Sequence, residues 1–233
     1  MAIAVNGFAT GAANGGSPGA SGLTFNSHVL SSNARRIVIV AASFEGADQV
    51  PTDVTLDGVS MGTAEVSQVA NAGNNYQYKM LQADLPAGGS AYSVVITGLD
   101  AAIIAGTIGI DDAKQQAAEH TATWGANSGS AFDVPIVSVT TDALVIVYAN
   151  SDSALTTTWD TATELFDRNE PAAVDSTGAA AWEKFASPSS NEGGDFSGSR
   201  RHSATATAWE EDVGGGGADI RRHIIPAYMR MAA

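Results

Sequence analysis

The sequence predicts an all-β protein of the β-sandwich class, and three observations carry that prediction. Short stretches rich in Val, Ile, Thr and Tyr recur along the chain between clusters of Gly, Asn, Asp and Pro, which is typical of strands joined by turns. Residues 22–43 are echoed at 129–150, at a constant offset of 107 residues in a chain of 233. The runs 37–40 and 144–147 are apolar on both faces, as expected of central strands in the core.

The echo indicates that the chain contains two related halves. At the constant offset Phe25 lies opposite Phe132 and Val29 lies opposite Ile136, so the recurring feature is a packing pattern and not a catalytic motif. The match continues more weakly, with 91–98 laid over 201–208 and 103–110 over 220–229. We expect one domain over residues 1–233, with pseudo-repeated halves at about 22–110 and 129–231 and an N-terminal arm with a Gly-rich loop at 1–21.

We expect about ten to twelve strands, packed as two face-to-face sheets in a sandwich of jelly-roll type. Strand signals occur at residues 2–8, 22–26, 36–43, 53–61, 74–82, 91–99, 103–110, 132–139, 143–150, 163–168, 178–186, 201–209 and 220–231. Asp57-Gly58 suits a tight hairpin turn. One short helix is expected at 111–121, where good helix formers follow two acids. Residues 187–199 and the glycines 214–217 are expected to be loops.

Composition narrows the function classes. The chain has 25 acidic and 11 basic residues, for a formal charge of -14, and an acidic surface repels phosphate, so we expect no nucleic-acid partner. It has no cysteine, which excludes disulfides, thiolate catalysis and cysteine-bound zinc. The N-terminus lacks the basic and apolar regions of a signal peptide, and no run is long enough to span a bilayer, so we expect neither a signal peptide nor membrane insertion.

A succession of short motifs carries a family resemblance. The motifs are Asp57-Gly58-Val59 with Met61, Leu81 at a strand end, the loop Pro86-Ala87-Gly88, and Thr97-Gly98. Their order resembles a jelly-roll or Ig-like sandwich module of tailed-phage virion proteins and bacterial surface proteins, well over about 22–150 and loosely beyond. Ile110-Asp111-Asp112 departs from the module's usual "GVD". The resemblance implies a fold and a virion or surface context, and it implies no catalytic residue and no glycan site.

The sequence contains no nucleophile elbow, P-loop, HExxH or dinucleotide fingerprint. The four histidines, His28, His120, His202 and His223, lack metal-ligand spacing. Acids that could supply calcium ligands are Asp53, Asp57, Asp111, Asp112, Glu210, Glu211 and Asp212. None of them has the EF-hand pattern, and solvated turn acids are the favoured interpretation. We expect no catalytic residue, no metal site and no cofactor.

The candidate binding residues are tryptophans and arginines. The tryptophans are Trp124, Trp159, Trp182 and Trp209, and the arginines are Arg200, Arg201, Arg221 and Arg222. The tryptophans belong either to a core or subunit interface or to a glycan-stacking platform, and we favour the first. The arginines either dock the C-terminal region onto an acidic neighbour or lie outward beside the chain's own acids, and both interpretations stay open.

We therefore expect a non-enzymatic bacteriophage virion protein, made in the host cytoplasm and incorporated as a capsid decoration, head-fibre or tail-associated subunit. Its expected partners are other virion proteins and further copies of itself, with adhesion to a host-surface glycan as an additional role. The alternative is a carbohydrate-binding module of a surface or secreted protein. That alternative predicts glycan binding by the isolated monomer through one or more tryptophans.

Overall fold

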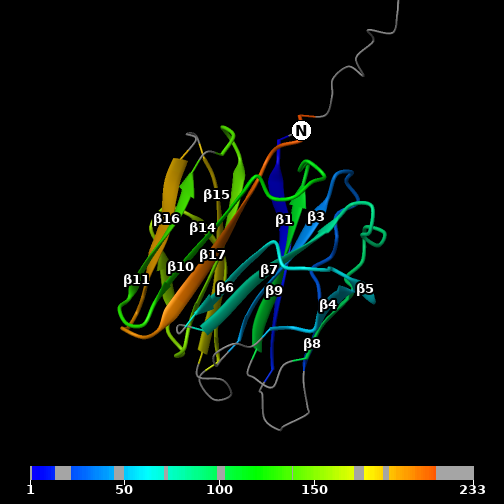
Figure 1. Ribbon diagram of the computed structural model, residues 1–233. Helices are drawn as coiled ribbons and strands as arrows, with labels where there is room; N and C mark the ends of the chain where they lie inside the picture. Colours follow the sequence, from blue (N-terminus) through cyan, green and yellow to red (C-terminus); the bar gives the residue numbers. More distant parts are fainter. Residues whose placement is uncertain are drawn as a thin grey trace, which may run out of the picture.

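The computed structural model describes residues 2–13, 22–44, 50–70, 73–98, 103–137, 139–170, 176–185 and 189–213. These residues form seventeen strands in four antiparallel sheets, and no helix occurs among them (Figure 1). The all-β prediction is confirmed. The expected arrangement of two sheets is replaced by four sheets, two from each half of the chain.

The first half forms a five-stranded and a four-stranded sheet. The five-stranded sheet has the order β1 (Ala4–Ala13), β9 (Ile103–Asp111), β3 (Ile37–Phe44), β7 (Gly73–Leu81) and β6 (Val66–Ala70). The four-stranded sheet has the order β2 (Gly22–Asn26), β8 (Ser93–Thr97), β4 (Asp53–Leu56) and β5 (Val59–Ser60). Asp57 and Gly58 join β4 to β5 with positive φ angles of 53° and 77°, as the expected tight turn requires.

The second half forms a five-stranded and a three-stranded sheet. The five-stranded sheet has the order β10 (His120–Ala126), β17 (His202–Trp209), β12 (Leu144–Ser151), β15 (Ser176–Lys184) and β14 (Thr163–Glu170). The three-stranded sheet has the order β11 (Ala131–Val137), β16 (Ser189–Phe196) and β13 (Thr157–Trp159). Both sheets of this half are antiparallel.

The two halves share one strand order. In each five-stranded sheet the first strand of the half pairs with the last, as β1 with β9 and β10 with β17, and the third strand is central. In each smaller sheet the second strand pairs with the last but one, as β2 with β8 and β11 with β16. The central strands β3 and β12 begin at Ile37 and Leu144, which are 107 residues apart, the offset of the sequence echo.

Two local expectations are wrong, and a third falls on residues that the structure does not describe. The weak match of 91–98 with 201–208 is displaced by one strand, because β8 corresponds to β16 and β9 to β17 in sheet order. The range 220–229 lies outside the described residues. The expected loop at 187–199 contains β16, because cross-strand pairing with β11 and β13 holds a segment whose glycines and acids disfavour a strand.

The helix expected at 111–121 is also wrong. Residues 112–119 follow an irregular path between β9 and β10. The backbone N–H of Ala113 donates to the carbonyl of Arg35 at 3.2 Å, and that of Lys114 donates to the carbonyl of Glu210 at 2.9 Å. Because these groups bond to distant segments, tertiary contacts override the local helix propensity.

The central strands alternate between two cores. Val38 and Val40 of β3 point into a core between the two sheets of the first half. Ile37 and Ile39 point the other way, into a core that also contains residues of β12, β15 and β17. This second core, which we call the inter-sandwich core, joins the two five-stranded sheets, and its large members are Ile3, Ile37, Ile39, Ile108, Ile110, Leu144, Ile146, Tyr148, Phe166 and Trp209. A third core lies between the two sheets of the second half and contains Val145 and Val147.

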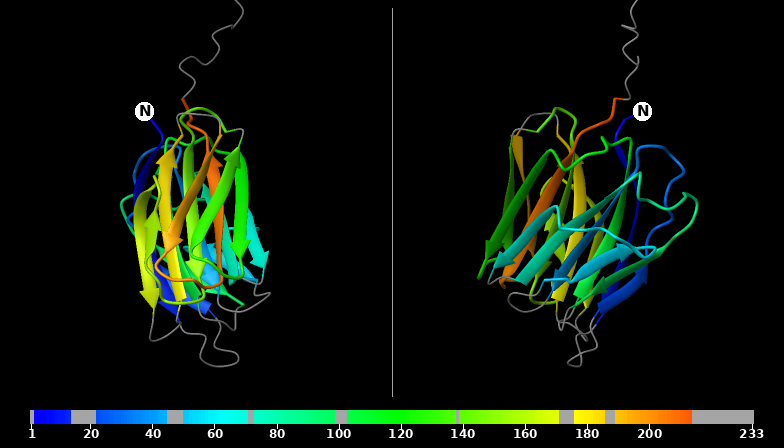
Figure 2. Two further views of the ribbon diagram at one scale, coloured as in Figure 1. Left: turned by 90° about the vertical axis from the view of Figure 1, so that its left-hand side faces the viewer. Right: turned by 45° about the vertical axis from the view of Figure 1, so that its right-hand side comes forward.

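The molecule is thus built as two sandwiches that pack through their five-stranded sheets. Figures 1 and 2 show the two halves side by side, with β17 next to β6 and β7, and these strands contact one another. The outer layers are the four-stranded sheet of one half and the three-stranded sheet of the other. Every residue of β3, β9, β12 and β17 is buried, because both faces of these strands are covered.

Glycine permits the close approach of the two five-stranded sheets. A Cβ at Gly178 of β15 would lie 2.5 Å from the Tyr148 hydroxyl and 2.6 Å from a methyl of Ile104. A Cβ at Gly106 of β9 would lie 2.5 Å from the ring of Phe166. All three distances are shorter than side-chain packing allows, so these two positions need a residue without a Cβ.

Buried polar side chains lie beside the inter-sandwich core and form what we call the polar seam, which consists of Asn75, Gln77, Thr205 and Thr207. The Gln77 amide of β7 donates to the Thr205 carbonyl at 2.9 Å and to its hydroxyl at 3.1 Å, and it accepts from the Thr207 hydroxyl at 2.8 Å. The Asn75 amide donates to the Tyr148 carbonyl at 2.9 Å and accepts from the Thr205 hydroxyl at 2.9 Å. Since Asn75 and Gln77 are fully buried, these bonds satisfy groups that would otherwise oppose packing of the two halves.

Candidate functional site

Two of the four candidate tryptophans lie at the inter-sandwich core. Trp209 of β17 is 1% exposed, and its indole N–H donates to the Thr207 hydroxyl at 3.0 Å. Trp182 of β15 is partly buried and packs against the same core. Both side chains therefore contribute to the joining of the two sandwiches.

The other two tryptophans lie at the ends of an aromatic row in the second sandwich. Trp159 packs edge-on against Phe132 with ring centres 5.4 Å apart and an interplanar angle of 83°. Phe132 contacts Phe196, Phe196 contacts His202, and His202 stacks on Trp124 with centres 4.7 Å apart. Both tryptophans are partly buried against the second-half core, so the four candidates are divided between two cores.

The candidate arginines differ in their surroundings. The guanidinium of Arg201 pairs with Asp152, with Nε donating to a carboxylate oxygen at 2.6 Å. The guanidinium of the exposed Arg200 donates to the Ser199 carbonyl at 3.1 Å. The pair Arg221 and Arg222 lies outside the described residues. Arg201 thus lies beside one of the chain's own acids.

Several acids that could have served as calcium ligands already have protein partners. Asp111 accepts from the side chains of Asn6 at 2.6 Å, Ser31 at 2.7 Å and Asn33 at 2.6 Å, and so organises the loop that follows β2. Asp112 forms a salt bridge with the Arg35 guanidinium, at 2.7 Å. In the part of the chain that the structure describes, no group of three or more His, Asp or Glu side chains is arranged to hold a metal ion.

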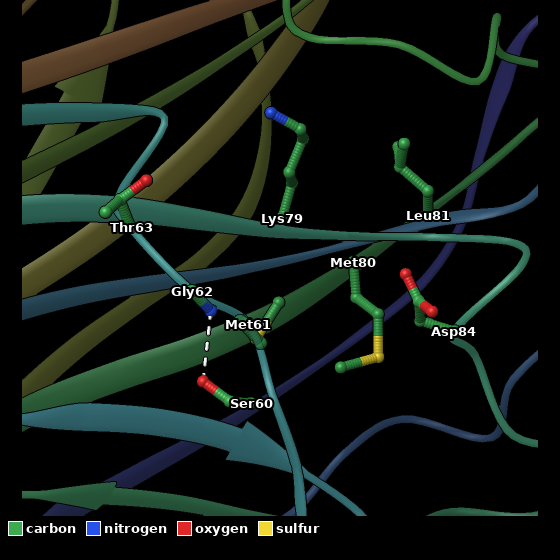
Figure 3. Close-up of a pocket in the computed structure, with 8 residues that line it drawn as sticks. All are labelled: Ser60, Met61, Gly62, Thr63, Lys79, Met80, Leu81 and Asp84. Atoms are coloured by element: carbon green, nitrogen blue, oxygen red, sulfur yellow. Dashed lines mark hydrogen bonds between the residues drawn. The ribbon is translucent and has the colours of Figure 1, made fainter.

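A cavity of about 310 Å³ opens beside β7 in the first half (Figure 3). It is lined by Ser60, Met61, Gly62, Thr63, Lys79, Met80, Leu81 and Asp84. Met61 and Met80 belong to the first-half core. Lys79 pairs with Glu65, and burial lowers the pKa of this lysine. Its ammonium group is thus already engaged, and the lining offers no nucleophile paired with a base.

A buried carboxyl group in the second half was not anticipated from the sequence. Glu192 of β16 is 1% exposed, and neither of its carboxylate oxygens has a hydrogen-bond partner while it is ionised. Burial, a contact with the Glu183 carboxyl group, and the negative charges of Glu183, Asp160 and Asp133 raise the pKa of Glu192 to about 8. The local sequence Asn-Glu-Gly-Gly carries no signal of this, since acids beside glycines are typical of loops.

Comparisons with protein-family models, with curated proteins and with solved structures found no match to this chain. Within the described ranges there is no helix of the length and hydrophobicity needed to span a bilayer.

Proposed function

We propose that this chain is a non-enzymatic structural subunit of a bacteriophage virion, a capsid decoration, head-fibre or tail-associated protein that acts by binding other virion proteins. The observation that carries the proposal is the joining of two sandwiches of the same strand order through an apolar core. A molecule built in this way holds its two outer sheets in one fixed spatial relation to each other. Such a relation suits a subunit that contacts several neighbours in an assembly.

The outer layers supply the binding surfaces in this proposal. The outward face of the three-stranded sheet exposes Asp133, Asn191 and Asp195. Gly193 lies on the same face and adds no side chain to it. Asn191 donates to Asp133 at 3.0 Å, which orders this face. An acidic, ordered face favours a partner that presents positive charge, because complementary potentials guide association and set the orientation of the complex.

We also infer that each half is a jelly roll. The order β1-β9-β3-β7 over β2-β8-β4-β5 supports this inference, because strands pair from the ends of the half inward and alternate between the two sheets. The second half repeats the order, with β10-β17-β12-β15 over β11-β16-β13. The sandwich module of tailed-phage proteins that the sequence resembles has this class of fold.

Two measurements on the purified full-length chain test the proposal against the carbohydrate-binding alternative. We expect light scattering after size exclusion to show a homo-oligomer, and a glycan array to show no binding. A monomer that binds glycans, and loses that binding when the partly buried Trp124 or Trp159 is replaced by alanine in a folded variant, would refute the proposal.

The arginine pair offers a second test in the assembled particle. Arg200→Glu with Arg201→Glu reverses two charges at the surface, where the ion pair with Asp152 contributes at most about 1 kcal/mol to folding. Incorporation into particles is expected to fall while the melting temperature changes little. Asp152→Asn, which removes the same ion pair without reversing the arginine charges, is the control. Full incorporation of the double variant would remove these arginines from the binding surface.

A further inference from the structure

Two carboxyl groups face each other between the sheets of the second sandwich. Glu192 of β16 lies opposite Val134 of β11, and Val134 points into the second-half core, so Glu192 points inward as well. Glu183 of β15 lies opposite Val145 of β12, which points into the same core. The two glutamates thus approach each other from the three-stranded and the five-stranded sheet.

The surroundings of Glu192 supply no compensating positive charge. The charged groups that act on it are Glu183, Asp160, which follows β13, and Asp133 of β11, and all three are acids. Lys184 is next to Glu183 in sequence, but in the sheet it lies opposite Leu144 of β12, whose side chain is in the inter-sandwich core. Successive strand residues point to opposite faces, so Lys184 belongs to the other side of the sheet.

The hydrogen bonds of the pair are incomplete as long as both groups are ionised. One Glu183 oxygen accepts from the Thr161 hydroxyl at 2.8 Å, whereas the Glu192 carboxylate oxygens are buried without a partner. A carboxylate accepts hydrogen bonds and cannot donate one, so two ionised glutamates in contact repel each other. A single proton converts the contact into a hydrogen bond from one carboxyl group to the other.

We propose that Glu192 keeps its proton at neutral pH and donates it in a hydrogen bond to the Glu183 carboxylate, so that a shared proton latches the three-stranded sheet onto the five-stranded sheet. In alkali the proton leaves to solvent, and two negative charges then face each other in the core. The hydrogen bond between the two carboxyl groups, which we call the latch, is therefore present at neutral and acidic pH and absent in alkali. This inference is independent of the proposed virion role.

The direction of the pH effect follows from the pKa of Glu192, which is raised from 4.5 to about 8. Between these values the folded protein holds one proton more than the unfolded chain, so stability falls as pH rises across this window. The contribution is fully present below the lower value and is lost above the upper one. For one proton the folding equilibrium constant changes by up to about tenfold per pH unit.

Glu192→Gln tests the latch, because the amide stays neutral and can still donate to Glu183. Melting temperatures are measured from pH 5 to pH 9.5 for the wild-type chain and the variant. We expect similar values at pH 5 and a higher value for the variant at pH 9. The control is Asp84→Asn, which removes an exposed carboxyl group from the first half and should follow the wild-type curve. Parallel wild-type and Glu192→Gln curves would overturn the proposal.

Two further measurements keep the result decisive. Carbon-13 NMR of the wild-type side chain should show the Glu192 carboxyl group titrating near pH 8, and titration near its ordinary value would contradict the latch even if the variant fails to fold. The alkaline melting temperatures are repeated with EDTA and with calcium chloride. We expect no difference between them. A rise with calcium that Glu192→Gln lacks would assign the pair to a cation in place of the proton.

Discussion

Gln77→Leu removes the centre of the polar seam between the two sandwiches. The Gln77 side chain is fully buried and makes three hydrogen bonds, two to Thr205 and one from Thr207, at 2.8–3.1 Å. Leucine has a similar volume, so the change removes the bonds without leaving a large cavity. The Thr205 carbonyl then loses a donor, and the Thr207 hydroxyl loses its acceptor.

The expected cost follows from the number of bonds. Each buried hydrogen bond contributes a net stability of about 0.5–1.5 kcal/mol, and orphaned buried groups add to the loss. We expect the free energy of unfolding to fall by about 2–4 kcal/mol. For a chain of this length the melting temperature should then fall by roughly 2–4 °C for each kcal/mol. The bonds join the two halves of the chain, so the loss weakens their packing.

Urea unfolding followed by tryptophan fluorescence and circular dichroism measures this cost. Gln116→Leu, at an exposed glutamine outside the seam, is the matched control and should change stability by less than about 0.5 kcal/mol. Adding Thr207→Val to Gln77→Leu should recover none of the loss, because the buried indole N–H of Trp209, which donates to the Thr207 hydroxyl at 3.0 Å, then loses its acceptor. Wild-type stability in Gln77→Leu would refute the argument that the seam holds the halves together.

Three further predictions concern buried positions. Trp209→Ala should lower the free energy of unfolding by about 3–5 kcal/mol in chemical denaturation, because it opens a cavity in the inter-sandwich core. Gly178→Ala should cost about 1–3 kcal/mol, because its Cβ would meet Ile104 of the other five-stranded sheet, whereas Gly125→Ala would meet only the end of a flexible side chain at 3.2 Å; equal costs would contradict the close approach of the sheets. Burial lowers the pKa of His28 to about 4, so the folded protein binds fewer protons than the unfolded chain between pH 6.5 and about 4, and stability should fall as pH falls through this window. His28→Gln should lack this acid-side loss in melting experiments, and a variant with the wild-type pH profile would show that His28 is not its source.

The central strands could be predicted from the sequence because their apolar runs match a position in the middle of a buried sheet. The runs 37–40 and 144–147 were expected to be central because both faces are apolar, and they form β3 and β12 at the centres of the two five-stranded sheets. The same two-sided burial indicates a layer on each face. Sequence alone left open whether those layers belong to one sandwich or to two, because periodicity reports burial and not the identity of the covering sheet.

The missed elements are stabilised by distant partners. β16 contains two glycines and two acids, and its position comes from pairing with strands on both sides. Residues 112–119 have helix propensity, yet their backbone bonds to Arg35 and Glu210. At the candidate sites, the sequence favours a core or subunit-interface position for the tryptophans, whereas the Glu183–Glu192 contact depends on register between two sheets and has no local signature.

We propose that two sandwiches joined through their five-stranded sheets act as one subunit of a phage particle. The most direct test is mass spectrometry of phage particles purified from cells that produce this chain, with antibody labelling in the electron microscope. We expect several copies of the chain at one defined location on every particle. Particles that lack the chain would contradict it.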